Sequence, residues 1–161
     1  MNRLRQAKCA FTLIELLVVI GIMVLLAAIL LPTVLRAIGQ AEKVQANSDI
    51  KQIETAVKAF FNEYGRYPGQ VKSEDFISST DSRRTNIIAV LRGLNDTENP
   101  RRIQFLEVPA KSLDRNQFVD PWGNPYMIAY DGDFDNFIRS IPRTVLTGRQ
   151  VAVWSIGPDG E

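Results

Sequence analysis

The sequence predicts an α+β protein in which one long N-terminal helix spans a membrane with its first half and packs on a small antiparallel β-sheet with its second half. An apolar run covers Phe11 to Leu31, and apolar residues then recur at three- and four-residue spacing up to Tyr64, which is the period of a helix. Segments that alternate at period two, as strands do, come only near the C-terminus. With 161 residues, the chain has room for one modest domain besides the helix.

The apolar run predicts a transmembrane and assembly helix at residues 11–31. Its length is roughly 21 residues, or about 31 Å at the helical rise, which matches the hydrocarbon core of a bilayer. Arg3, Arg5 and Lys8 precede it without an acid near them, whereas the basic residues that follow alternate with acids. Because positive charge marks the cytoplasmic side, we expect the N-terminus in the cytoplasm and the rest of the chain beyond the membrane.

Three simpler interpretations compete for this segment. A secretory signal peptide fits the small residues Ala37 and Gly39, but the apolar core of such a peptide spans only about 7 to 15 residues. The length of the run also disfavours a buried core helix of a soluble protein. A plain membrane anchor for an unrelated enzyme fits the length and the charges, so these two properties alone leave it open.

A single carboxylate, Glu15, interrupts the apolar run close to its start. An ionisable side chain within a membrane span is costly, although less so near the edge, and it indicates a functional role whose partner has to be identified. No other residue of the span is expected to pair with it. The simpler interpretation is that Glu15 reaches the membrane surface or is protonated.

The motif AFTLIELLVVIG begins at Ala10, follows a short basic leader at residues 1–10, and resembles the N-terminal segment of type IV pilins and of type II secretion pseudopilins. The resemblance implies that prepilin peptidase cuts between Ala10 and Phe11 and that the new amine of Phe11 is methylated. Ala10 departs from the Gly that the family prefers before the cut. Since cleavage creates a cation at Phe11, we expect Glu15 to face the Phe11 amine of an adjacent subunit and to set the stagger of a fibre.

Residues 32–65 are predicted to be an amphipathic extension of the same helix. Its stronger apolar stripe consists of Ile50, Ile53, Val57, Phe60, Phe61 and Tyr64. Gly65 provides a C-cap that ends the helix. Pro32 removes a backbone donor, so a kink or local melting is expected around residues 28–32, and Gly21 is a second weak point.

Residues 66–161 are expected to form a globular α+β head, which the resemblance makes similar to that of a type IV pilin. The segment RTNIIAVLRG predicts a short helix that ends at Gly93. Strands of a small antiparallel sheet are predicted in PYMIAYD and QVAVWSI, with a weaker strand at residues 137–141.

The motif DPWGNPY, at residues 120–126, predicts a rigid turn in which Trp122 is a core anchor rather than a platform for a ligand. Together with SIGPDG at residues 155–160, this motif resembles the head of the major pseudopilins of type II secretion. The resemblance covers most of the chain but not residues 70–115.

The segment YDGDFDN places Asp131, Asp133 and Asp135 at alternate positions. In an extended chain the three carboxylates lie on one side, where they repel one another unless water or a cation screens them. Carboxylate oxygens suit Ca²⁺, but the EF-hand pattern fails because its twelfth position is Pro142. A solvated acidic turn is the simpler interpretation.

The resemblance also implies a calcium site in the C-terminal loop of the pseudopilins. In this sequence Asp159 and the carbonyl of Ile156 match two ligand positions. The loop of the family continues with further ligands, whereas this sequence ends at Glu161, so we expect a family-type site only if the turn at Asp131 supplies the remaining ligands. No other cofactor is expected.

Composition argues against an enzyme and against a nucleic-acid-binding protein. The chain has no histidine, one cysteine (Cys9) and a net charge of +1, and it lacks the common nucleophile and phosphate-binding motifs. We expect a single-pass protein of the bacterial inner membrane, with its head in the periplasm or otherwise beyond the membrane.

The resemblance implies a structural subunit that packs with copies of itself and with other pseudopilins into a fibre on an inner-membrane assembly platform. A type II secretion pseudopilin that promotes protein export is the first prediction. A type IV pilin for adhesion, motility or DNA uptake is the alternative, although such pilins commonly carry a disulfide that the cleaved chain cannot form. A membrane-anchored binding module that never polymerises is the third interpretation.

Overall fold

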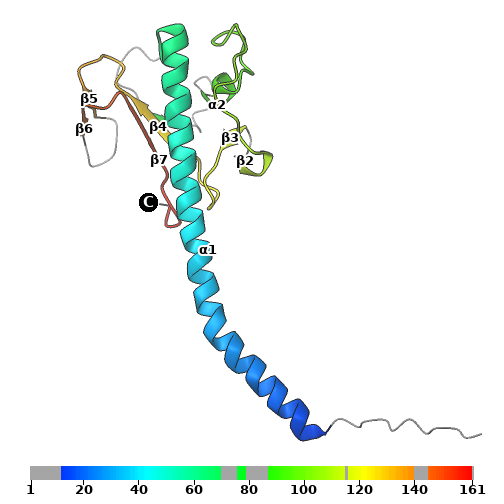
Figure 1. Cartoon of the computed structure of the whole chain (residues 1–161). Helices are drawn as coiled ribbons and strands as arrows, with labels where there is room; N and C mark the ends of the chain where they lie inside the picture. Colours follow the sequence, from blue (N-terminus) through cyan, green and yellow to red (C-terminus); the bar gives the residue numbers. More distant parts are fainter. Residues whose placement is uncertain (1–11, 70–75, 79–86, 115, 140–144, 161) are drawn as a thin grey trace, which may run out of the picture. The chain divides into compact units, whose positions relative to one another are not determined.

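The computed structural model describes residues 12–69, 76–78, 87–114, 116–139 and 145–160. The predicted leader, Cys9 and the cleavage site between Ala10 and Phe11 lie outside these residues. The elements are α1 (Leu13–Tyr64), β1 (Phe76–Ser78), α2 (Ile87–Leu91), the 3₁₀-helix η1 (Ala110–Ser112), β2 (Leu113–Asp114), β3 (Gln117–Phe118), β4 (Met127–Tyr130), β5 (Phe137–Ile138), β6 (Leu146–Thr147) and β7 (Val151–Trp154) (Figure 1). The predicted α+β class is confirmed.

The chain forms two compact units, Met1–Ala41 and Glu42–Glu161, and α1 contributes to both. In the first unit α1 is long and apolar enough to cross a membrane, and no residue of its most apolar stretch is buried. The helix continues through Pro32, where the Thr33 hydroxyl donates to the Ile29 carbonyl over 3.3 Å. Local melting is therefore absent, and a kink remains as the prediction for Pro32 and Gly21.

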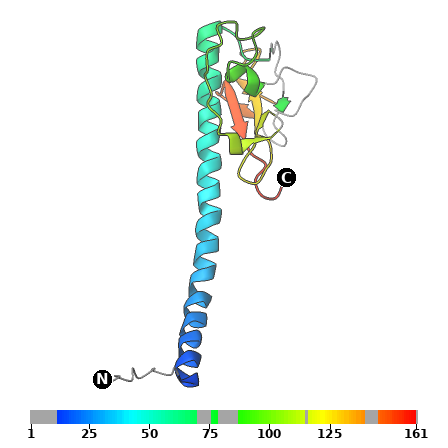
Figure 2. The same cartoon turned by 90° about the vertical axis from the view of Figure 1, so that its right-hand side faces the viewer.

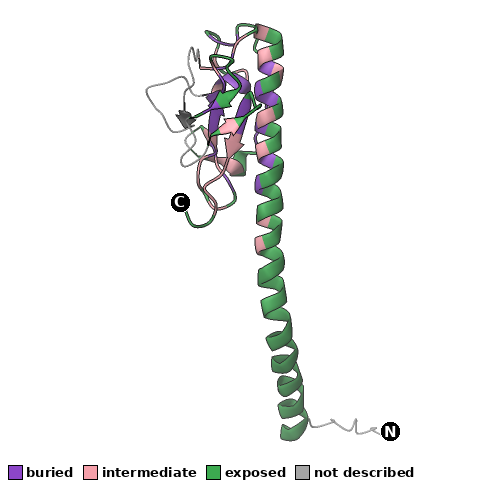
Figure 3. Cartoon of the chain, turned by 90° about the vertical axis from the view of Figure 1, so that its left-hand side faces the viewer, coloured by how far each residue is buried: buried purple, intermediate pink, exposed green. Residues whose placement is uncertain are grey.

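In the second unit, α1 buries the predicted stripe against the head. Ile53, Val57 and Phe60 are fully buried, with smaller residues between them. Ile50, Phe61 and Tyr64 are partly buried against the same core. Figure 3 shows buried positions only on the part of α1 that belongs to this unit. Each fully buried large apolar side chain contributes about 1.5 to 3 kcal/mol, so the stripe holds the helix to the head.

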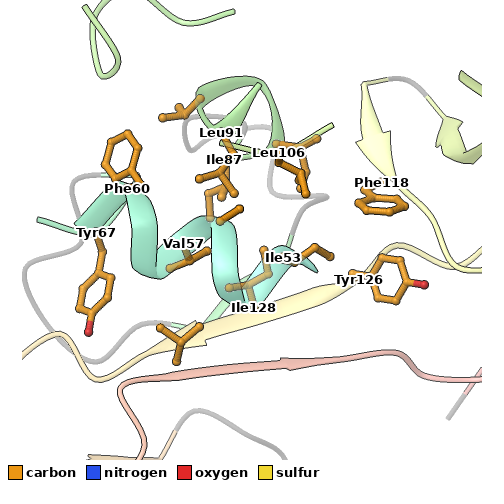
Figure 4. Packing of buried hydrophobic residues seen from close by; sticks show 14 of the residues in the cluster. Ile53, Val57, Phe60, Tyr67, Ile87, Leu91, Leu106, Phe118, Tyr126 and Ile128 are labelled. Carbon is orange, nitrogen blue, oxygen red and sulfur yellow. The ribbon is translucent and has the colours of Figure 1, made fainter. Parts of the chain in front are cut away.

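The head contains a three-stranded antiparallel sheet in the order β1–β4–β7. In β4 and β7, Met127 pairs with Trp154 and Tyr130 with Val151. Because side chains alternate along a strand, Ile128, Tyr130 and Val151 join the core formed with α1 and α2, whereas Ala129 and Ala152 pack on the other face with Ile138. Figures 2 and 4 show the sheet beside α1 and the core side chains between α1, α2 and β4.

The head agrees with the predicted strands PYMIAYD and QVAVWSI, in which β4 and β7 lie. The predicted helix at residues 84–93 is shorter in the described part, where α2 covers Ile87–Leu91, and residues 84–86 lie outside it. Of the weaker strand at 137–141, β5 covers the first two residues, and 140–141 lie outside the described part. The short β1 and the β2–β3 hairpin were not predicted.

Candidate functional site

The first turn of α1 holds Glu15 by a capping box. The Glu15 carboxylate oxygen Oε2 accepts from the Thr12 backbone N–H over 2.9 Å and from the Thr12 hydroxyl over 2.6 Å. In return, the Glu15 N–H donates to the Thr12 hydroxyl oxygen over 3.3 Å. These contacts satisfy two backbone donors that a helix start leaves free. The prediction that Glu15 has no partner in the span is therefore wrong.

A long apolar surface follows this cap, and Thr33 and Arg36 interrupt it only near its end. The large apolar side chains that are at least 41% exposed between the cap and residue 38 are Leu13, Ile14, Leu16, Leu17, Val18, Val19, Ile20, Ile22, Met23, Val24, Leu25, Leu26, Ile29, Leu30, Leu31, Val34, Leu35 and Ile38. Just before and after Pro32 this surface has an apolar hollow of about 550 Å³, to which Ala27 and Ala28 contribute small side chains. A helix that is apolar on all sides requires lipid or other apolar helices around it.

Polar contacts of Tyr126 and Trp122 join the head to α1. Asp49 is 3% exposed and accepts from the Tyr126 hydroxyl over 2.9 Å and from the Gln45 side-chain amide over 2.8 Å. Burial, together with the hydrogen bond to Asp49, raises the pKa of Tyr126 well above its ordinary value. The Trp122 indole N–H donates to Glu42 over 3.1 Å. Trp122 is only partly buried, so its predicted role as a core anchor is wrong.

The two predicted head motifs form one structural unit around Asp120. Its Oδ1 accepts from the backbone N–H groups of Trp122 (3.0 Å) and Asn124 (2.8 Å), and its Oδ2 accepts from the Ser155 hydroxyl (2.5 Å). The Asn124 amide donates to the Gly157 carbonyl over 2.8 Å. DPWGNPY and SIGPDG are thus tied together by hydrogen bonds, and their geometry assigns them a structural role.

Besides Asp49, two further buried polar residues were not predicted from the sequence. Glu98 is 1% exposed and accepts from the Gly69 N–H over 2.6 Å, with Arg66 at 3.5 Å. Asn99 is fully buried, accepts from the Tyr64 hydroxyl over 2.7 Å and donates to the backbone carbonyls of Val90 in α2 and of Ile103. Both contacts connect the end of α1 to the loop after α2, and nothing in the local pattern TENP distinguishes them from a solvated turn.

The three acids after β4 do come together. One carboxylate oxygen each of Asp131, Asp133 and Asp135 lies within 4.8 Å of the others. Asp131 is 1% exposed, and its two oxygens accept from the backbone N–H groups of Asp135 (3.2 Å) and Asn136 (3.0 Å). Asp135 pairs with Arg139 over 2.6 Å, and the hydrogen bond from Arg139 is the main reason that the pKa of Asp135 lies below its ordinary value.

Asp159 does not join this acidic group among the described residues. In the β4–β7 register, Asp131 follows the pair Tyr130–Val151, whereas Asp159 follows Trp154 at the opposite end of the strands. Asp159 is also exposed. A single ion therefore cannot take ligands from both ends, and any site at Asp131 has to be considered without Asp159.

The chain is similar to known proteins, both in its apolar N-terminal segment and over most of its length. Residues 5–31 match the family model of the prokaryotic N-terminal methylation motif. A type II secretion system core protein G of Klebsiella michiganensis is 36% identical over 97% of this chain and 87% of its own length. Another, of Pseudomonas aeruginosa, is 31% identical over 80% of this chain and 78% of its own length.

A type IV major pilin protein, PilA, of Myxococcus xanthus is 36% identical over 70% of this chain. This chain spans only 50% of the length of that relative. No solved structure matches the chain.

Proposed function

Because the chain belongs to the type II secretion system core protein G family, the major pseudopilins, we propose that it is a structural subunit of a type II secretion pseudopilus. In this proposal prepilin peptidase cuts between Ala10 and Phe11 and methylates the Phe11 amine. Before assembly, the subunit lies in the bacterial inner membrane with its N-terminus in the cytoplasm. It then packs with copies of itself and with other pseudopilins on an assembly platform, and the fibre promotes protein export.

The observation that carries the proposal is the exposed apolar surface of α1 with a single acid at its first turn. The large apolar side chains of this surface are all at least 41% exposed. Lipid covers such a helix in a membrane, and neighbouring helices of the same kind can cover it in a fibre. The hollow that Ala27 and Ala28 help to line lets another helix approach closely. A soluble monomer offers neither kind of cover.

The geometry of Glu15 supports a double role in this proposal. Both hydrogen bonds of the capping box end on Oε2, although an ionised carboxylate can accept at about four positions. Glu15 can therefore keep its cap and also accept from the Phe11 amine of an adjacent subunit. Between packed helices the local dielectric is low, so such a charge pair strongly favours one stagger over others.

The decisive experiment separates the cap from the charge. Glu15→Gln keeps a side chain that a capping box accepts and removes only the negative charge. We expect this variant to insert and to be cut, but not to form fibres, because the amine of the neighbouring subunit loses its counter-charge. Thr12→Ser, which keeps the hydroxyl, is the matched control and should form fibres. Sheared fibres, counted by electron microscopy, and the amount of subunit in the membrane are the measurements.

Normal fibres from Glu15→Gln would show that Glu15 acts only as a helix cap, and would overturn the charge-pairing proposal. Mass spectrometry of the intact protein tests processing independently, since it reports both the cut and the methyl group. A native chain that still begins at Met1, or one cut beyond residues 11–31, would contradict the proposed processing.

The similarity to the Myxococcus xanthus pilin supports type IV pilin function as the second candidate. Deleting the gene separates the two: loss of exported proteins with normal surface pili supports the pseudopilin, and loss of pili with normal export supports the pilin. A uniformly monomeric size after extraction from the membrane, with no sheared fibres from cells, would instead indicate the anchored binding module.

A further inference from the structure

We propose that Phe134 of one copy of this chain inserts into a groove beside α1 of a second copy, and that Asp133 of the first copy pairs with Lys51 of the second. This inference rests on the proposed fibre and names a contact between the heads of its subunits. Both surfaces lie in the unit Glu42–Glu161. The contact is therefore separate from the one proposed for Glu15.

The groove lies between α1 and the chain that follows α2, and its volume is about 380 Å³. One wall is the face of α1 that carries Ser48, Thr55 and Ala59, and the other wall is residues 105–107. Alanine methyl groups and the side chains of Phe105 and Leu106 make much of its lining apolar. An apolar groove of this size can bury an apolar side chain of a partner.

Phe134, in the loop between β4 and β5, combines two unfavourable features. Its side chain is 55% exposed, and its φ of +60° lies in the left-handed region that bulky residues rarely adopt. Its ring lies 5.9 Å from that of Phe61 and 6.1 Å from that of Tyr67, between ring centres, so the ring is held in place. Strained residues gather at binding sites, and aromatic side chains are frequent anchors of protein–protein contacts. Phe134 has the properties of such an anchor.

The groove and Phe134 lie on different sides of α1. Phe61, which contacts Phe134, follows the groove residue Ala59 by two positions, and this turns its side chain about 160° away. Figure 1 shows the loop between β4 and β5 on the other side of α1 from the chain after α2. Each copy can therefore insert Phe134 into one neighbour and receive that of another. Contacts between two different surfaces of identical subunits build rings or open filaments, as a fibre requires.

The charges beside the two surfaces are complementary. Lys51 lines the groove, and Asp133 precedes Phe134 in the chain. Both residues are exposed, and neither takes part in an ion pair among the described residues. The opposite wall of the groove carries Glu107, which repels Asp133. The charges thus favour one orientation of the loop, with Asp133 on the α1 side of the groove.

A single shift between two subunits satisfies both proposed contacts. Glu15 meets the Phe11 amine of a neighbour when the two helices are displaced by about four residues, or about 6 Å. Because one symmetry operation relates identical subunits, the same shift along the fibre applies to their heads. With parallel helices, Phe134, which contacts Phe61, then lies just before Ala59 of the neighbour's helix, at the level of the groove.

Disulfide cross-linking in cells tests the contact directly. The probe is the full chain with Lys51→Cys and Asp133→Cys in a Cys9→Ser background, so that the two new cysteines are the only ones. We expect oxidation to link the subunits of a fibre into a ladder of dimers and longer chains on a non-reducing gel. The two positions lie on different sides of α1, so they cannot join within one chain. Each single cysteine variant is a control and should give no ladder.

Charge reversal tests the ion pair. Lys51→Glu and Asp133→Lys should each reduce the number of sheared fibres, because like charges then meet at the contact. The double variant should restore fibres, since it rebuilds the pair with the signs exchanged. Asp114→Lys changes an exposed acid that belongs to neither surface, and this control should form normal fibres.

Two further variants test the anchor and the groove separately. Phe134→Gly removes the ring, and the head should still unfold cooperatively, because glycine adopts a positive φ without strain. Loss of an aromatic anchor weakens a contact by roughly thirtyfold or more, so this variant should form few fibres. Thr55→Trp fills the groove at an exposed position and should have the same effect. Thr55→Ser, the matched control, keeps the groove open and should form fibres.

Three results would overturn this contact while the native chain still forms fibres: no ladder from the cysteine pair, no rescue by the double charge reversal, or normal fibres from Phe134→Gly. A cross-link from Lys51→Cys to a different protein would assign the groove to that partner and would also overturn it. None of these results affects the pseudopilin proposal. Absence of fibres from the native chain, in contrast, would contradict both.

Discussion

Replacing Tyr126 by phenylalanine tests how the head is held to α1. The Tyr126 hydroxyl donates to the buried Asp49 carboxylate over 2.9 Å, and Gln45 supplies the only other hydrogen bond to Asp49 among the described residues. Phenylalanine keeps the ring and its packing but removes the donor. The variant therefore leaves one oxygen of a carboxylate that is 3% exposed without its partner.

The expected loss of stability is about 2 kcal/mol, the usual contribution of a hydrogen bond to a buried charged group. For a unit of this size, 1 kcal/mol changes the melting temperature by roughly 3 to 5 °C, so Tyr126→Phe should melt about 6 to 10 °C lower. Tyr130→Phe is the matched control, because Tyr130 is equally buried on β4 but its hydroxyl has no partner among the described residues. This control should melt at the native temperature or slightly above it.

The assay is thermal unfolding of the full chain in detergent, followed by near-ultraviolet circular dichroism, which reports packing of the aromatic core. Equal losses in Tyr126→Phe and Tyr130→Phe would refute the reasoning, because the two variants share the lost hydroxyl but not the lost hydrogen bond. A loss in the control alone would show that the Tyr130 hydroxyl, rather than that of Tyr126, has the important partner.

Two further predictions concern pH and backbone conformation. Burial is the main reason that the pKa values of Tyr126 and Tyr130 are raised in the folded state, so the unfolded chain releases these two protons at lower pH. The free energy of unfolding should therefore be constant with respect to these groups below about pH 10 and should fall as the pH rises beyond it. Unfolding by urea between pH 8 and 11 measures this decrease. Gly93 has φ +75°, and an added Cβ would lie 2.8 Å from the Arg102 carbonyl oxygen, so Gly93→Ala should cost roughly 3 kcal/mol. Gly148→Ala, at φ +70° with open space around it, should cost only about 1 kcal/mol, and equal costs would contradict the overlap.

The sequence predicted the parts of the fold that depend on long periodic patterns. The stripe of Ile53, Val57 and Phe60 repeats over several turns, and it lies in the core as expected. Strands β4 and β7 have four residues each and alternate clearly. The hairpin β2–β3 has two residues in each strand, which is too short for any periodicity, and its existence depends on pairing rather than on local preference.

The candidate sites show the same division between local and distant contacts. The capping box of Thr12 and Glu15 is local, and its T-x-x-E spacing was visible in the sequence; considering only charged partners for Glu15 missed it, because a hydroxyl carries no charge. The contact of Asp120 with Ser155 joins residues that are 35 positions apart, so no local pattern could predict it. The separation of Asp131 from Asp159 likewise follows from the strand register.

The position of Glu15 explains how the helix tolerates a carboxylate before it has an external partner. The first turn of a helix is where its own dipole and its free N–H groups favour a negative charge. Thr12 adds two direct contacts, since its backbone N–H and its hydroxyl both donate to the same carboxylate oxygen of Glu15. One turn further along, the same acid would have neither support, and the apolar side chains around it would make its charge far more costly. The acid therefore lies where the helix itself stabilises it. In the proposed fibre, the amine of a neighbouring subunit would add to this cap without replacing it.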